Sequence, residues 1–90
     1  MINEEAMAAA FEARNQEAQV LGVTDTVDRT SVPINSCRLG EAIRFVANAP
    51  IVGYHVRAAM VMYGETGTPS LRAGDCATLW AKFGIALLER

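Results

Sequence analysis

The chain has 90 residues, a formal net charge of −2 and a hydrophobic fraction of 51%. This length corresponds to one domain, and we expect residues 1–90 to form a single helical domain. No cluster of basic residues is present, which argues against binding to a nucleic-acid backbone. The large apolar side chains are numerous for one small core. We therefore expect some of them to be buried against a second copy of the chain or against a protein partner.

The N-terminus is acidic at Glu4 and Glu5, where a secretory signal would be basic. The most apolar stretch, residues 43–62, contains polar residues and a proline that a membrane span would not tolerate. These residues are Arg44, Asn48, Pro50, His55 and Arg57. We expect a cytoplasmic protein that does not contact a membrane.

The first predicted helix spans residues 3–21. Asn3 suits its N-cap, and the acidic residues that follow favour the positive end of the helix dipole. An apolar stripe recurs at three- and four-residue steps, interrupted by Arg14. Its members are Met7, Phe11, Ala18 and Leu21. Because the stripe is narrow and the predicted helix is long, we expect Met7, Phe11 and Arg14 to contact a partner.

Residues 22–35 change character, since threonine, aspartate, serine and valine replace the good helix formers. Fourteen residues without regular structure would be unusually long inside a compact domain. The segment is expected to be either a long connection or a short strand near residues 23–28.

Three further helices are predicted, over residues 36–48, 50–63 and 69–89. Asn35 or Ser36 suits the start of the first, and Pro50 suits the first turn of the second. The stretch "IVGYHV" within residues 51–56 is the competing strand. In the last helix Trp80 lies off the apolar stripe, which favours a role in a helix or subunit contact.

Two segments share the pattern Ser-x-Arg-x-Gly-acid, "SCRLGE" at residues 36–41 and "SLRAGD" at residues 70–75. An arginine in the first turn of a helix is disfavoured by the helix dipole and needs a carboxylate or a bound anion nearby. In one interpretation Arg38 pairs with Asp75 and Arg72 with Glu41, about a pseudo-two-fold axis. A glycine one turn into a helix indicates that another helix or a ligand approaches closely.

The alternative interpretation is an anion site, with a phosphate or carboxylate held at a helix start near Arg72 or Arg38. Tyr54 or Trp80 would stack on a ring of the same ligand. The candidate ligand-binding residues are Arg38, Tyr54, Thr68, Ser70 and Arg72.

Catalytic chemistry has little support in the sequence. His55 is the one histidine, and Cys37 and Cys76 are too few to form a structural zinc site with it. No nucleophile, metal or dinucleotide motif is present. We expect no catalytic residue, no metal and no cofactor.

The sequence as a whole predicts an all-α fold, a small four-helix domain with a long Thr/Asp-rich connection after the first helix. The alternative is an α+β fold with short strands near residues 23–28 and 51–56. The predicted function is a non-enzymatic protein–protein interaction module that acts as a homo-oligomer, such as an adaptor, an assembly factor or an inhibitor. Its expected partners are itself and an unidentified protein. The alternative function is small-ligand or nucleotide binding.

Overall fold

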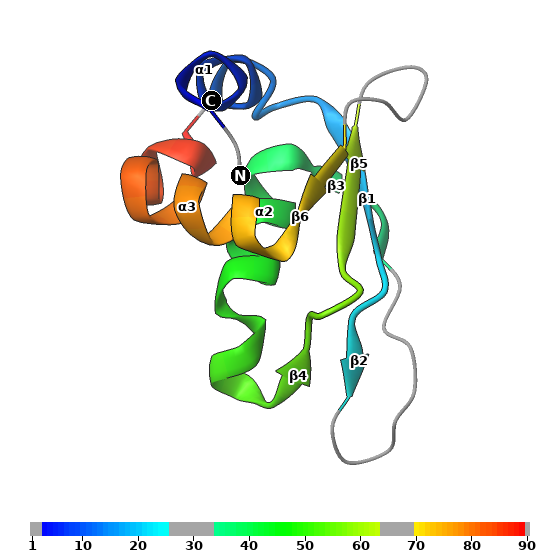
Figure 1. Cartoon of the computed structure of the whole chain (residues 1–90). Coiled ribbons are helices and arrows are strands. Elements are labelled where there is room, and N and C mark those ends of the chain that lie inside the picture. The colour runs from blue at the N-terminus through cyan, green and yellow to red at the C-terminus, as the bar shows by residue number, and fades with distance from the viewer. Residues whose placement is uncertain (1–2, 26–33, 64–69, 90) are drawn as a thin grey trace.

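An antiparallel sheet with helices on one side forms the body of the protein in a computed structural model, which describes residues 3–25, 34–63 and 70–89 (Figure 1). In chain order the elements are α1 (Glu4–Glu12), β1 (Glu17–Leu21), β2 (Thr24–Asp25), β3 (Ile34–Arg38), α2 (Leu39–Asn48), the 3-10 helix η1 (Ala49–Val52), β4 (Tyr54–His55), β5 (Met60–Tyr63), β6 (Ser70–Arg72), α3 (Ala73–Phe83) and the 3-10 helix η2 (Gly84–Leu88).

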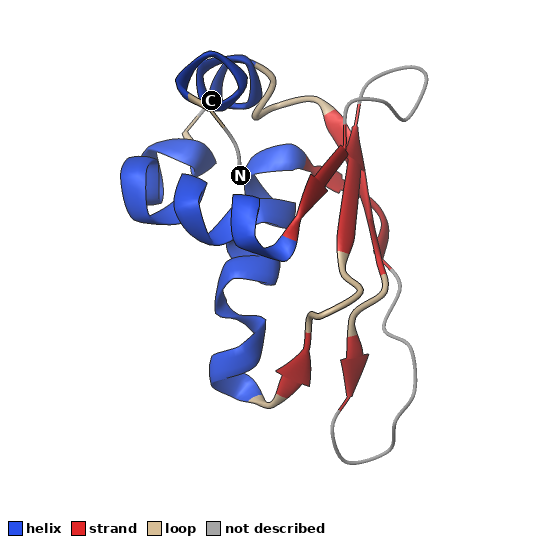
Figure 2. Ribbon diagram, in the orientation of Figure 1, coloured by secondary structure: helices blue, strands red, loops and turns tan. Residues whose placement is uncertain are grey.

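The predicted all-α fold is wrong, and the alternative α+β class is confirmed. Four strands form one sheet in the order β3-β1-β5-β6, and every neighbouring pair is antiparallel. The two ranges named in the alternative contain β2 and β4, which pair with each other as a separate two-stranded ribbon. The four strands of the main sheet were not predicted. Figure 2 shows the helices gathered on one side of this sheet.

The predicted helix over residues 3–21 is wrong in its second half, where residues 17–21 form the strand β1. The periodicity of burial changes accordingly after Arg14. Helix α1 ends at Glu12, and along β1 exposed and buried residues alternate, with Ala18 and Val20 turned into the core. This period of two matches a half-buried strand, in which successive side chains point to opposite faces. The interruption at Arg14 therefore marks the end of the helix.

The predicted helix over residues 50–63 is likewise wrong. The chain continues from α2 into the short helix η1 and then turns at Gly53, whose φ of 98° lies in the left-handed region. Beyond the turn, β5 buries Val61 and Tyr63 and leaves Met60 and Met62 partly exposed. The alternation of β5 matches that of β1, and Val20 pairs with Val61 and Ala18 with Tyr63 on the buried face.

Each of the remaining predicted helices begins with a strand. β3 leads directly into α2, and β6 leads directly into α3. The predicted cap of the first of these helices, Asn35 or Ser36, lies within β3, and Arg38 takes the cap position. The two repeated sequence segments thus occupy the same structural place, an edge strand that turns into a helix.

The core lies between the sheet and helices α2 and α3, which pack against each other. Its largest fully buried side chains are Leu39, Ile43, Leu79, Leu87, Val20, Val23, Val46, Val61 and Cys76. Helix α1 closes one end of this core through Met7 and Ala10, and the ring of Phe11 stacks on that of Phe83 with centroids 4.5 Å apart. Among the described residues, no helix is long and apolar enough to cross a bilayer.

The predicted cap of the first helix is present, because the Asn3 side chain accepts a hydrogen bond from the Ala6 amide at 2.7 Å. We expect Asn3→Ala to lower the free energy of unfolding by about 1 kcal/mol, since it removes the capping oxygen. Asn3→Ser keeps an oxygen there and should retain most of the stability. Urea denaturation of both variants measures the difference, and equal losses would show that the cap contributes nothing specific.

Candidate functional site

The two repeated segments place Arg38 and Arg72 at helix starts. In each segment the backbone amide of the arginine donates a hydrogen bond to the carboxylate three residues later. The Arg38 amide donates to Glu41 Oε1 at 3.3 Å, and the Arg72 amide donates to Asp75 Oδ2 at 3.0 Å. In both cases the acidic residue at the third helical position caps the helix start. The carboxylate found at each arginine therefore comes from the same segment, and the predicted pairs of Arg38 with Asp75 and of Arg72 with Glu41 are not among these contacts.

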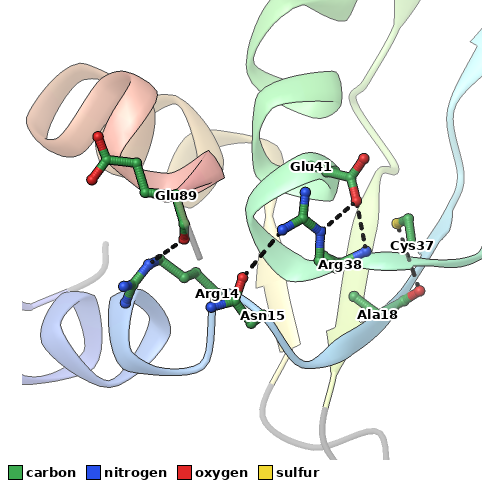
Figure 3. A network of polar contacts seen from close by, with 7 residues as sticks. All are labelled: Arg14, Asn15, Ala18, Cys37, Arg38, Glu41 and Glu89. Atoms are coloured by element: carbon green, nitrogen blue, oxygen red, sulfur yellow. Dashed lines mark hydrogen bonds and ion pairs between the residues drawn. The ribbon is translucent and has the colours of Figure 1, made fainter.

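At the first segment the side chains form a polar network (Figure 3). The guanidinium of Arg38 forms an ion pair with Glu41 at 3.0 Å and donates to Asn15 Oδ1 at 3.3 Å. Arg14 donates to the Glu89 carbonyl oxygen at 3.0 Å and lies 4.4 Å above the ring of Phe11. These contacts tie the end of α1 to the start of α2 and to the chain after η2.

The candidate ligand-binding residues are not brought together into one pocket. Arg38 and Arg72 lie on opposite edge strands of the sheet, which are three strand spacings, about 14 Å, apart. At each helix start a carboxylate already accepts from the backbone amide, where an anion would need a donor. Ser70 is exposed on β6, Tyr54 packs against Phe45, and Thr68 lies outside the described residues. The structure therefore lends no support to an anion site, which stays a prediction.

The candidate partner-binding residues make contacts within the chain. Met7 is buried, and Phe11 and Arg14 are half-buried in the contacts described above. Trp80 is half-buried on α3 and packs against the core. Whether any of them also contacts a partner stays a prediction.

Burial raises the pKa of both thiols. Cys76 is fully buried on α3, and burial, with a smaller contribution from Asp75, raises its pKa to about 12. Burial and the nearby Glu41 also raise the pKa of Cys37, whose Sγ lies 3.7 Å from the Ala18 carbonyl oxygen. A raised pKa opposes formation of the nucleophilic thiolate. Within the described part of the chain, no three His, Cys, Asp or Glu residues cluster as metal ligands do.

The feature that best fits a binding surface is an open groove of about 360 Å³ beside α2 and η1. We call it the η1 groove, and it is lined by Glu41, Arg44, Phe45, Asn48, Ala49 and Val52. The apolar part of the groove packs on the rest of the protein. Ala49 is buried, and the Phe45 ring packs on that of Tyr54 with centroids 6.0 Å apart. Glu41, Arg44 and Asn48 supply the polar part of the lining.

Two adjacent apolar residues of η1 are strongly exposed, and one of them, Val52, lines the η1 groove. Ile51 is 80% exposed and Val52 is 71% exposed, and we call these two residues the apolar pair. They lie on η1, the green helical segment between α2 and β4 in Figure 1, on the side of the molecule away from α1. Single exposed apolar residues are ordinary on a soluble protein, and Ile85 on η2, at 72%, is one. Ile51 and Val52 differ from Ile85 because they are adjacent in the chain and because Val52 also lines the η1 groove.

This surface was missed by sequence reasoning, although part of its signal was visible. The predicted helix over residues 50–63 places Ile51 and Val52 inside a long regular element, and the structure places them on the short helix η1. In the sequence "APIVG" only two residues lie between the proline and the glycine, less than one helical turn, which is too short to give both Ile51 and Val52 a buried face. That constraint was the available clue.

No protein family, no curated protein and no solved structure matches this chain.

Proposed function

We propose that this chain is a non-enzymatic protein-interaction module that acts as a homo-oligomer and binds through the apolar pair and the η1 groove. The observation that carries the proposal is the exposure of Ile51 and Val52, at 80% and 71%, next to an open groove. Burying an aliphatic side chain of this size contributes about 1.5–3 kcal/mol. Protein interfaces characteristically surround such an apolar centre with a polar rim.

The rim of the groove suits a protein partner. Arg44 is exposed, and its guanidinium makes no hydrogen bond or ion pair within the described residues. Glu41 is exposed as well and carries the opposite charge three residues earlier on α2. A mixed rim of this kind adds specificity and orientation to the binding energy that the apolar pair supplies.

Site-specific photo-crosslinking tests this function. A benzophenone amino acid at position 51 should form covalent adducts with protein, both in the purified sample and in the native cells, when it is irradiated. The same probe at position 85 is the matched control, because Ile85 is exposed to a similar extent on a different element. Adducts that form at position 51 and not at position 85 are the expected result. Equal yields at both positions, or none at either, would count against the proposal.

A further inference from the structure

We infer that the η1 groove binds an acidic peptide segment of another protein, in which an aspartate or glutamate pairs with Arg44 and a neighbouring apolar side chain lies against Phe45. This partner chemistry rests on the proposed function and deepens it. The observation behind it is the charge of the groove lining, because the acidic group of the lining is paired within the chain and the basic group is not.

The lining of the groove consists of two rows of side chains along α2 and η1. One row is polar and the other is apolar, and in each row the residues follow one another at steps of three or four. The polar row is Glu41, Arg44 and Asn48, and the apolar row is Phe45, Ala49 and Val52. Side chains at such steps lie on the same side of a helix. A peptide that runs along the groove can therefore place a charged side chain on one row and an apolar side chain on the other.

The apolar row leaves space for one side chain of the partner. Phe45 is half-buried, and its ring is held by Tyr54, whereas Val52 is 71% exposed. Between them in the row lies Ala49, a small residue that is itself buried. An aliphatic or aromatic side chain that enters above Ala49 would contact both Phe45 and Val52 and would lose its contact with water.

The polar row presents one positive charge to the partner. Glu41 forms an ion pair with Arg38 at 3.0 Å, and the Asn48 side chain donates to the Arg44 carbonyl oxygen at 2.8 Å. The Arg44 guanidinium is exposed and makes no hydrogen bond or ion pair within residues 3–25, 34–63 and 70–89. Carboxylates complement a guanidinium in both charge and shape, because two parallel hydrogen bonds can form between them.

The second repeated segment shows that the fold does not require these side chains. Helix α3 begins thirty-four residues after α2, so Thr78 corresponds to Arg44 and Leu79 to Phe45. The Thr78 hydroxyl donates to the Gly74 carbonyl oxygen at 3.0 Å, and Leu79 is fully buried. The exposed arginine and the half-buried aromatic ring are therefore features of the groove and not of the strand and helix that the two segments share.

Selection from a phage-displayed library of random dodecapeptides on the immobilised full-length protein tests the inference. The wild-type protein should enrich peptides in which an acidic residue stands next to an aliphatic or aromatic one. Arg44→Glu should lose these peptides and enrich basic residues in their place. Arg57→Glu is the matched control, because it makes the same charge change at an exposed arginine that does not line the groove, and it should select the same acidic peptides as the wild type.

Fluorescence anisotropy with the most enriched wild-type peptide, made synthetically, measures the two contributions separately. Arg44→Glu should weaken binding of this peptide by about 10-fold or more, and added salt should weaken its binding to the wild type. Val52→Ser should weaken binding with little change in its salt dependence, since it removes an apolar contact. Both variants alter exposed side chains, and circular dichroism checks that they remain folded.

The outcomes separate the acidic peptide from the proposed function. If the selected peptides carry no acidic residue, or if Arg44→Glu and Arg57→Glu select the same peptides, the acidic partner is excluded, and adducts at position 51 would still support an interaction function. If no peptide is enriched, the acidic partner is likewise excluded. The proposed function fails as well if position 51 also yields no adduct.

Discussion

Gly40→Ala is expected to destabilise the fold by about 3 kcal/mol, the upper end of the usual range for overpacking. A Cβ atom at position 40 would lie 1.9 Å from the carbonyl oxygen of Leu87 and 2.8 Å from its carbonyl carbon. Both are backbone atoms, so relief requires that α2 and η2 move apart. Leu87 is 1% exposed, and such a movement would also disturb the packing of its side chain.

The backbone on the other side of Gly40 is fixed as well. Its amide donates to the Arg14 carbonyl oxygen at 2.9 Å, and the Leu39 amide donates to the Gln16 carbonyl oxygen at 2.8 Å. The start of α2 is therefore held between η2 and the turn that follows α1. A shift that relieves the clash with Leu87 would strain these hydrogen bonds.

Gly74→Ala is the matched control, because Gly74 occupies the corresponding place in the second repeated segment. Apart from its chain neighbours and the backbone of its own helix, no heavy atom would lie within 4 Å of a Cβ atom at position 74. Alanine is favoured over glycine inside a helix by roughly 0.5–1 kcal/mol, so Gly74→Ala should stabilise the protein by about that amount. Urea denaturation of both variants provides the measurement. Equal effects at the two positions would show that the approach of η2 to α2 has been misjudged.

Gly40 and Gly74 show which part of the structure could be predicted from the sequence. The two repeated segments have the same local structure, a strand that leads into a helix. The prediction that another element approaches closely at the glycine is confirmed at Gly40, which lies against the backbone of η2. At Gly74 nothing approaches. The local pattern is the same at both positions, and the difference depends on η2, which packs against α2 from more than forty residues further along the chain.

The strands of the main sheet could not be predicted from local sequence patterns, because they too depend on contacts with distant segments. The strand β1 reads "EAQVL", and most of these residues are also good helix formers. Its strand character comes from pairing with β3 and β5, which are distant in the sequence. Tertiary pairing can override intrinsic propensity in such a segment. The helices α2 and α3 were foreseen in their interiors because their apolar residues recur with helical spacing.

The candidate site was hidden by the same long-range dependence. Ile51 and Val52 are apolar, and a sequence pattern assigns apolar residues to a core. Their exposure follows from where the chain turns at Gly53 and from the pairing of β4 with β2 rather than with the main sheet. The general expectation of surplus apolar surface was made from composition, whereas its location required the structure.

The second large effect is a loss of stability at alkaline pH that originates at Cys76. Its thiol has a reference pKa of 9.0, and burial raises the pKa in the folded protein to about 12. The folded state therefore retains the thiol proton between these values while the unfolded state releases it. Stability is fully present below pH 9 and is lost as the pH rises toward 12.

The size of this loss follows from the shift. Each pKa unit corresponds to about 1.4 kcal/mol, so three units amount to about 4 kcal/mol by pH 12, of which about 1 kcal/mol is lost between pH 9 and 10. The lower interval is the useful one, because Tyr63, whose pKa burial raises from 10.0, contributes increasingly above it. Urea denaturation under reducing conditions at pH 8, 9 and 10 measures the slope.

Cys76→Ala identifies the source of the slope. The variant should be less stable than the wild type at pH 8, because it leaves a small cavity between α3 and the core. Its stability should nevertheless fall less between pH 8 and 10, since the titrating thiol is gone. Cys37→Ala is the matched control, and its effect on the slope should be smaller because Cys37 is only half-buried. A slope that Cys76→Ala leaves unchanged would show that the thiol is not shielded from water, and with it that α3 does not pack on the core as described.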